Sequence, residues 1–341
     1  MPFTDDPTAE ERKKDHIDLA FKSQIGVDSL DKRFYYEPLF APHPTKEALY
    51  GNTTFLGKRM QAPIWVSSMT GGTKMANTIN HSLAKVCGAF GMGMGLGSCR
   101  ALLYSDEHLK DFDVRHLIGD DFPLYANLGI AQLEQLIFQN ELYRIYQLLD
   151  KLKADGLIIH INPFQEWMQP EGDRYAQSPL TTIRTILDKM DIRVVVKEVG
   201  QGMGYESLKA LLQLPLEAVD FAASGGTNFS MVELLRSDET QRAAYQNLAH
   251  VGHSAEEMVN LCNQIKEELG NKLQCHQLII SGGVKDFLDG YYLTEKADFP
   301  AIYGQASGFL KHAQGDYESL YQHVERQVEG LKLAKAYLKV R

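Results

Sequence analysis

Eight short apolar or glycine-rich segments alternate with helix-length stretches along most of this chain, and this alternation constrains the fold more than any other feature. Each segment has the length of a buried parallel strand, and each intervening stretch can form a crossover helix. Eight such units predict a closed (β/α)8 barrel, or TIM barrel, in preference to an open doubly wound sheet. The predicted strands are residues 64–67, 91–95, 124–127, 157–161, 193–198, 218–222, 278–281 and 301–304.

Additions to the barrel are expected at two places. Residues 1–60 precede the first strand and are predicted to form an N-terminal extension or lid, and residues 61–341 are predicted to form the barrel. The stretch between the sixth and seventh strands is longer than one helix requires, which predicts an insertion there. Helical periodicity is found over residues 75–87, 133–152, 181–190, 207–214, 255–269 and 317–338.

Composition excludes several classes of function. A net charge of −9 argues against a nucleic-acid-binding surface, although local basic clusters can still bind anionic substrates. No apolar stretch approaches the ~18 residues of a membrane span, and the acidic start does not resemble a leader, so a soluble, cytoplasmic protein is expected. The four cysteines have no zinc-type spacing and are expected to stay reduced.

The second predicted strand is unusual because glycine alternates with larger residues over residues 91–97. Glycine in a strand is typical of positions where a ligand or another backbone comes close. We therefore expect such a close approach at this strand.

The run from His160 to Asp173 places many polar groups directly behind a buried strand. In parallel α/β folds, ligands bind at the carboxyl ends of the strands, so this imidazole with its carboxamides and carboxylates is a candidate site. The alternative is an ordinary polar loop in which Asn162 and Pro163 form a turn.

Glycine-rich turns end four of the predicted strands, within residues 67–72, 97–100, 224–227 and 281–283. Loops after the last strands of such barrels commonly bind phosphate through backbone amides with no Cβ in the way. The Gly225-Gly226 and Gly282-Gly283 pairs therefore predict a phosphate site.

Lys197 interrupts an apolar strand near its end. A buried ammonium group requires a partner, so one interpretation is an ion pair with Glu198 or another acid. The other is that Lys197 stabilises negative charge on the ring of a reduced flavin.

These motifs together resemble those of the type 2 isopentenyl-diphosphate isomerases, FMN-dependent (β/α)8-barrel enzymes. The resemblance extends from Arg12 to about Leu310. Its matching residues are Arg12-Lys13-Lys14-Asp15-His16, Ser67 to Gly72, Gly97-Ser98, Asn127-Leu128-Gly129, His160 to Asp173, Lys197-Glu198-Val199-Gly200, Gly225-Gly226-Thr227 and Ser281-Gly282-Gly283.

The resemblance implies a role for each matched residue. FMN would be bound by Met69, Thr70, Gly71, Ser98, Asn127, Lys197, Gly225, Gly226, Thr227, Gly282 and Gly283. The substrate diphosphate would be contacted by Arg12, Lys13, His16, Arg100, His160 and Asn162. Gln165 would lie beside the reacting carbons as the catalytic side chain, and Glu166 would hold Mg²⁺.

The implied reaction is the reversible isomerisation of isopentenyl diphosphate to dimethylallyl diphosphate in isoprenoid biosynthesis. Reduced FMN would exchange the protons, because Gln165 is not an acid and Glu166 is committed to the metal. NADPH would serve as reductant, residues Arg12 to Lys14 would belong to a lid, and the protein would form a homo-oligomer, a tetramer or an octamer.

Some positions depart from the family pattern. Cys99 and Lys285 replace a Gln and an Arg, and residues 301–306 differ from the family's Ala-Gly-Ala-rich ending. Two alternatives remain on the same barrel: an FMN-dependent 2-hydroxy-acid oxidase or dehydrogenase, and a flavin-binding protein without catalytic activity. The His-Gly-x-Arg run typical of such oxidases is absent from the sequence.

Overall fold

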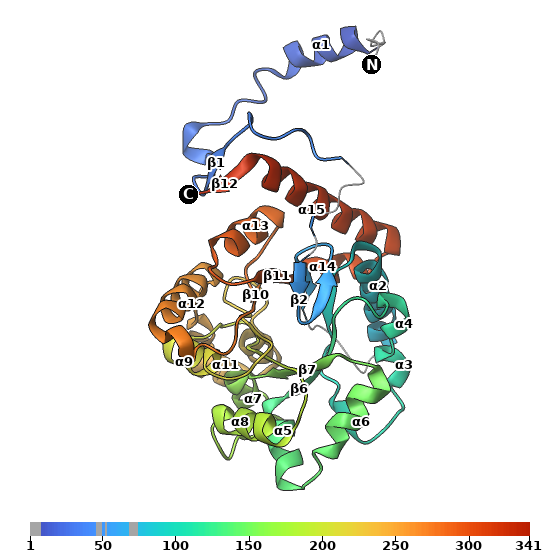
Figure 1. Cartoon of the computed structure of the whole chain (residues 1–341), viewed down its shortest axis with the longest axis vertical. Coiled ribbons are helices and arrows are strands. Elements are labelled where there is room, and N and C mark those ends of the chain that lie inside the picture. Colours follow the sequence, from blue (N-terminus) through green and yellow to red (C-terminus); the bar gives the residue numbers. More distant parts are fainter. Residues whose placement is uncertain (1–7, 46–49, 52, 68–73) are drawn as a thin grey trace.

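The computed structural model describes residues 8–45, 50–51, 53–67 and 74–341, and its centre is a closed barrel of eight parallel strands (Figure 1). The order around the barrel is β10-β11-β4-β5-β6-β7-β8-β9, so neighbours in sequence are neighbours in space except at the closure between β11 and β4. The predicted (β/α)8 fold is therefore confirmed. The strands are β4 Ile64–Val66, β5 Gly93–Gly95, β6 Leu124–Gly129, β7 Gly156–His160, β8 Val194–Lys197, β9 Ala218–Asp220, β10 Leu278–Ser281 and β11 Ala301–Gln305.

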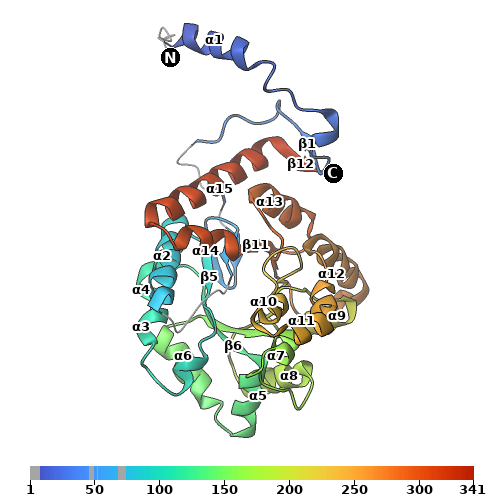
Figure 2. The ribbon, with the colours of Figure 1, turned by 180° about the vertical axis from the view of Figure 1, so that it is seen from behind.

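Helices surround the barrel in both ribbon views (Figures 1 and 2). They are α2 Lys74–Phe90, α3 Leu109–Phe112, α4 Arg115–Ile118, α5 Ile130–Phe138, α6 Tyr143–Leu152, α7 Pro163–Met168, α8 Pro179–Lys189, α9 Tyr205–Leu212, α10 Phe229–Arg236, α11 Glu239–Tyr245, α12 Ala255–Leu269, α13 Phe287–Lys296, α14 Ser307–Ala313 and α15 Tyr317–Tyr337. Helices α10 to α12 form the predicted insertion between the sixth and seventh barrel strands.

One predicted helix, over residues 133–152, is wrong, because the chain turns between α5 and α6. Asn140 adopts a positive φ of 57°, and the amide of Glu141 donates back to the carbonyl of Leu136 at 2.8 Å. Asparagine tolerates this left-handed conformation at a helix end. The apolar periodicity resumes after the turn and so concealed it.

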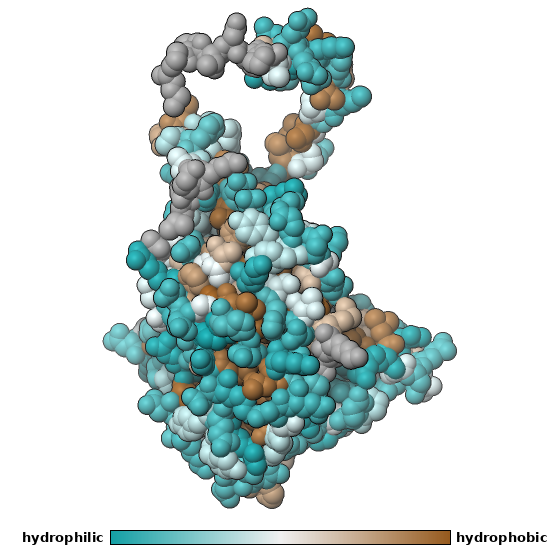
Figure 3. All heavy atoms as spheres, turned by 90° about the vertical axis from the view of Figure 1, so that its right-hand side faces the viewer, coloured by the Kyte–Doolittle hydropathy of each residue, from teal (hydrophilic) through white to brown (hydrophobic). Residues whose placement is uncertain are grey.

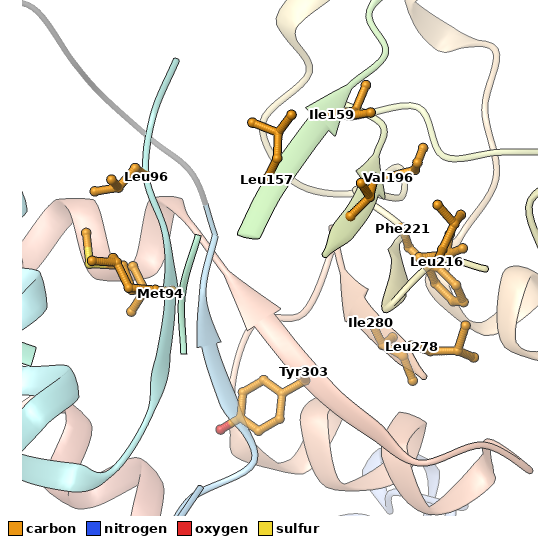
Figure 4. Packing of buried hydrophobic residues seen from close by; sticks show 14 of the residues in the cluster. Met94, Leu96, Leu157, Ile159, Val196, Leu216, Phe221, Leu278, Ile280 and Tyr303 are labelled. Carbon is orange, nitrogen blue, oxygen red and sulfur yellow. The ribbon is translucent and has the colours of Figure 1, made fainter. Parts of the chain in front are cut away.

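Alternate residues of the barrel strands face opposite sides, and both sides are apolar. Ile158 on β7 and Val195 on β8 join Trp65 and Tyr125 in the barrel interior. Their neighbours Leu157, Ile159 and Val196 face the surrounding helices (Figure 4). Burial on both faces explains why these strands are continuous apolar runs.

A hairpin of β2 Thr53–Phe55 and β3 Lys58–Met60 precedes the barrel. Its Phe55 and Met60 are fully buried in the interior cluster with Trp65. These residues, which the sequence analysis places in the N-terminal extension, therefore belong to the barrel's core.

Gly93 of the second strand is approached closely by a side chain. A Cβ on Gly93 would lie 2.5 Å from the indole ring of Trp65, the register partner of Gly93 on β4. At this position the close approach is made by an aromatic ring in the barrel interior and not by another backbone, whereas Gly97, at the end of the same run, lines a cavity.

The N-terminal residues form an arm that extends past α15, away from the barrel (Figures 1 and 2). Its helix α1 Ala9–Leu19 has no buried residue, and its strand β1 Phe34–Tyr36 pairs antiparallel with β12 Leu338–Val340 near the C-terminus. Hydrophobic residues are visible along the arm in Figure 3. Two side chains of the arm, Phe21 and Leu39, are 84% and 88% exposed.

Two further expectations concern the described residues. No helix among them has the length and apolar character required to cross a membrane. All four cysteines are buried and unbridged, in agreement with the absence of zinc-type spacing: Cys87, Cys99, Cys262 and Cys275.

Candidate functional site

Two adjacent cavities lie among the loops that follow the barrel strands. The larger, of about 290 Å³, is lined by the loops after β8, β9, β10 and β11, and we call it the glycine cavity. The smaller, of about 150 Å³, is lined by Gly97, Ser98, Asn127, His160 and Gln165, and we call it the carboxamide cavity. Both are also lined by Lys197, Val199 and Phe229, so these three residues join them into one site.

The two predicted glycine pairs pack against each other in the wall of the glycine cavity. A Cβ on Gly225 would lie 3.1 Å from Cα of Gly283, and a Cβ on Gly226 would lie 3.2 Å from its amide nitrogen. Gly282 has a φ of +86°, and a Cβ there would lie 2.0 Å from the carbonyl oxygen of Ala223. Bare backbone with no side chain is what an anion-binding loop requires.

Other residues complete the lining of this cavity. Thr227 lines it as predicted, and Lys285, which replaces the family's arginine, provides an exposed cation there. The segment from Gly304 to Gly308 lines the same cavity, whereas the sequence analysis singles out residues 301–306 only as a departure from the family's ending and names none of them as a binding residue. Its small residues directly after the eighth strand are the signal that could have revealed it.

Lys197, at the end of β8, is only 7% exposed. Its Nζ donates to the backbone carbonyl of Glu198 at 2.6 Å. The side chain of Glu198 instead accepts from the amides of Gly200, Gln201 and Gly202, so the suggested ion pair with Glu198 is wrong. Within the described part of the chain, no carboxylate forms an ion pair with Lys197, and its charge faces the two cavities.

His160 and Asn127 form a fixed pair in the carboxamide cavity. Nδ1 of His160 lies 2.7 Å from Oδ1 of Asn127, whose Nδ2 donates to the carbonyl of Leu96 at 3.1 Å. Nδ1 of His160 therefore carries a proton and donates it. Burial and the charge of Lys197 lower the pKa of His160 to about 4, so the imidazole is neutral near pH 7 and its Nε2 has a lone pair.

Helix α7 presents Gln165 and Glu166 beside this pair. It begins directly after Asn162, with Pro163 at its first position, where proline is favoured. Asn162 is 3% exposed, and its Nδ2 donates to Gln165 at 3.0 Å and to Glu166 at 3.1 Å. The polar run after β7 is therefore a short helix with a connected set of side chains, and not a simple turn.

The surroundings of α7 include a carboxylate that the sequence did not reveal. Nε2 of Gln165 lies 3.5 Å from Oε1 of Glu233, which is 4% exposed and comes from α10 in the insertion. Only the tertiary contact between α7 and α10 brings Glu233 to this site. Arg100 is also nearby, because it pairs at 3.0 Å with Asp173, whose amide donates to Glu166 at 2.8 Å.

The remaining predicted residues are not brought together with these. Arg12, Lys13 and His16 are exposed on α1 in the arm and line neither cavity. Met69, Thr70 and Gly71 lie outside the described residues.

Glu166 is the predicted metal ligand. Among the described residues, no group of three or more His, Cys, Asp or Glu side chains could hold a metal ion. Mg²⁺ commonly binds through one or two carboxylates together with substrate phosphate oxygens. The two oxygens of Glu166 accept hydrogen bonds from Nδ2 of Asn162 and from the amide of Asp173, and their remaining lone pairs could bind such an ion.

The fold and the site together define a (β/α)8 barrel whose candidate site lies at the carboxyl ends of its strands, where enzymes of this fold bind their ligands. Solved structures of similar fold include a flavocytochrome b2 variant with sulfite bound, at 14% identity and a TM-score of 0.59, which covers 94% of this chain and 78% of that chain. A mandelate oxidase variant with an FMN adduct has 13% identity and a TM-score of 0.52, covering 89% of this chain and 88% of that chain. These similarities establish the fold alone.

Sequence relatives define the family. No model of a protein family matches the chain. The isopentenyl-diphosphate delta-isomerase of Rickettsia peacockii (strain Rustic) is 35% identical over 330 residues, covering 95% of this chain and 92% of the relative. The enzyme of the same name from Rickettsia prowazekii (strain Madrid E) is 33% identical over the same shares. The chain belongs to the isopentenyl-diphosphate delta-isomerase family, which confirms the predicted resemblance.

Proposed function

We propose that this protein interconverts isopentenyl diphosphate and dimethylallyl diphosphate in isoprenoid biosynthesis, with FMN in its reduced form as cofactor. The observation that carries the proposal is the junction of the two cavities at Lys197. One cavity offers backbone to a phosphate, and the other offers carboxamides and an imidazole to a second ligand. A cofactor and a substrate can thus meet at one buried cation.

The glycine cavity fits the phosphate end of FMN. The facing Gly225-Gly226 and Gly282-Gly283 pairs leave space that any Cβ would fill, and Thr227 adds a hydroxyl. Lys197 forms no ion pair among the described residues, although the buried carboxylate of Asp220, its register partner on β9, interacts with its charge; Lys197 would stabilise an anionic ring. Reduced FMN, when bound, would supply the acid and the base of the isomerisation.

The carboxamide cavity would hold the substrate. Asn127 and Ser98 would border the cofactor there, while Gln165 would lie beside the reacting carbons. Asn162 holds the side-chain oxygen of Gln165, which fixes the direction of the carboxamide. His160 is neutral and its Nδ1–H is used by Asn127, so it requires a proton on Nε2 before it can donate to a diphosphate.

The diphosphate itself would bind at the edge of this cavity. Glu166 would hold Mg²⁺ on the diphosphate. Arg100 would give up its ion pair with Asp173 and bind the diphosphate instead. Arg12, Lys13 and His16 would reach it only through a movement of the arm, as expected of a lid.

Other parts of the proposal concern the protein's surroundings. NADPH would reduce the flavin, and the protein would act in the cytoplasm. The exposed apolar side chains of the arm support a homo-oligomer, a tetramer or an octamer, because large apolar groups in contact with water are commonly covered by a partner. Residues that carry this exposure include Ile17, Phe21, Ile25, Val27, Leu39 and Phe40.

The test follows the alkene by NMR in deuterated water. Purified protein with FMN, Mg²⁺ and NADPH should interconvert the two diphosphates and incorporate deuterium, without stoichiometric use of NADPH after the flavin is reduced. A protein that binds no FMN would contradict the proposal. Reduction of the flavin by lactate or glycolate, with no deuterium in the diphosphate, would favour the 2-hydroxy-acid oxidase alternative.

A further inference from the structure

Two buried glutamines connect the C-terminal helix α15 to the glycine cavity. Nε2 of Gln327, on α15, donates to Oε1 of Gln305 at 3.0 Å. Nε2 of Gln305 donates in turn to the carbonyl oxygen of Val284 at 3.2 Å. Each glutamine is 5% exposed, so water does not compete for these hydrogen bonds.

The direction of this chain of hydrogen bonds is fixed at its outer end. The hydroxyl of Tyr303 donates to Oε1 of Gln327 at 3.2 Å, and Nε2 of Gln327 lies 3.0 Å from Nε2 of His323. That contact requires His323 to accept, because the amide nitrogen of Gln327 has only hydrogens to offer. Burial is the main cause that lowers the pKa of His323 to about 4, so the ring is neutral and able to accept.

The inner end of the chain lies where two cavity loops meet. Val284 directly follows Gly282-Gly283 after β10, and Gln305 ends β11. The side chain of Gln305 therefore connects the loop after the seventh barrel strand to the loop after the eighth. Neither Gln327 nor His323 lines the cavity itself.

We propose that Gln327, oriented by His323, is a positioning residue that sets the spacing of the two loops around the phosphate of the cofactor. It acts through Gln305, which lies in the segment where this chain departs from the family's pattern. This inference rests on the proposed function, since it assumes that FMN places its phosphate in the glycine cavity. It assigns a positioning role to a residue on α15, a helix that lines neither cavity.

The test compares the affinities of the purified protein for FMN and for riboflavin, which lacks the phosphate. Gln327→Met keeps the length and volume of the side chain but removes its hydrogen bonds. It should weaken FMN binding about tenfold and leave riboflavin binding within about twofold of the unaltered protein. Fluorescence quenching of each flavin gives both dissociation constants.

Gln277→Met is the matched control. Gln277 accepts a hydrogen bond from the amide of Leu56 at 2.8 Å, in the loop of the β2–β3 hairpin and not at the glycine cavity. This substitution should leave the ratio of FMN to riboflavin affinity unchanged, whatever it does to the melting temperature. A second variant, His323→Phe, keeps an aromatic ring beside His312 but removes the Nε2 that accepts from Gln327. It should lower the ratio of FMN to riboflavin affinity about threefold. This variant serves as the test if Gln327→Met does not fold.

The outcomes separate the two proposals. If the unaltered protein binds FMN no better than riboflavin, the placement of the phosphate is wrong and the positioning role fails with it. If the unaltered protein prefers FMN but Gln327→Met weakens both flavins equally, or neither, the positioning role is wrong and the proposed function stands.

Discussion

The two halves of the barrel mouth are constructed by different means. The glycine cavity owes its shape to backbone, because its glycine pairs lie so close together that a Cβ added to Gly225 or Gly226 would be 3.1 or 3.2 Å from Gly283. The carboxamide cavity owes its shape to side chains, in which Asn127 fixes His160 and Asn162 fixes Gln165. One added side chain should abolish ligand binding at a site made of backbone. A single substitution in a network of side chains should remove only the binding energy of the hydrogen bonds that it breaks.

The largest effect is expected from Gly282→Ala. The φ of +86° costs about 1–2 kcal/mol for a residue with a Cβ, and that Cβ would lie 2.0 Å from the carbonyl oxygen of Ala223. FMN binding should weaken by a factor of ~100 or more, measured by fluorescence titration. Gly315→Ala is the control, because Gly315 lies outside the cavity and its added Cβ would be 3.4 Å from its nearest neighbour, the carbonyl oxygen of His312. Near-equal affinities of the two variants would disprove the backbone explanation.

Lys197→Met tests the junction between the halves. Loss of this buried cation should lower kcat for isomerisation by about 10²–10³, since an anionic ring would lose its neighbouring charge. The rate is measured by NMR, and the absorption spectrum of the reduced flavin reports its charge. Lys285→Met removes an exposed cation from the glycine cavity and should change kcat little. Equal losses in both variants would contradict a special role for Lys197.

Glu166→Gln addresses the outer edge of the carboxamide cavity. The concentration of Mg²⁺ that gives half-maximal rate should rise about 10- to 100-fold, with FMN affinity unchanged. A titration of the rate with Mg²⁺ measures this. Glu171→Gln is the matched control, because Glu171 is a nearby carboxylate that pairs with the exposed Arg236 at 3.0 Å. An unchanged Mg²⁺ requirement in Glu166→Gln would remove this residue from the metal site.

The smallest effect concerns pH and His160. Its pKa of about 4 in the folded protein lies below the ordinary value of 6.5, so the unfolded chain binds more protons between these values. The free energy of unfolding should therefore fall as the pH drops from 6.5 toward 4. The free energy of unfolding, measured in urea, should fall between pH 7 and pH 4.5 in both proteins. The fall should be about 1–2 kcal/mol smaller in His160→Gln than in the unaltered protein.

A control substitution sharpens this last measurement. His250→Gln changes an exposed histidine outside the site and should leave the pH dependence of unfolding as it is. If both variants behave alike, burial of His160 beside Lys197 does not contribute to acid sensitivity.

The two cavities also differ in how many of their residues could be predicted from the sequence. Gly225-Gly226 and Gly282-Gly283 were identified because two glycine pairs follow neighbouring strands near the place where barrels commonly bind phosphate, and the structure places both pairs in the lining of one cavity. The helix predicted over residues 133–152 failed because Asn140 turns the chain without interrupting the apolar pattern. Glu233 was missed, and so was the contact of Gln305 with Gln327, because both contacts join elements distant in sequence.

The sequence by itself determined the eightfold alternation, the order of the strands and the residues at their carboxyl ends, because these depend on local periodicity and on turns that only glycine can make. The tertiary structure alone decided that Lys197 has a carbonyl partner instead of Glu198, that Gly93 accommodates Trp65, and that Gln327 reaches the glycine cavity through Gln305. These contacts join residues on different elements or choose between competing partners, and the choice depends on distances that no pattern along the chain contains.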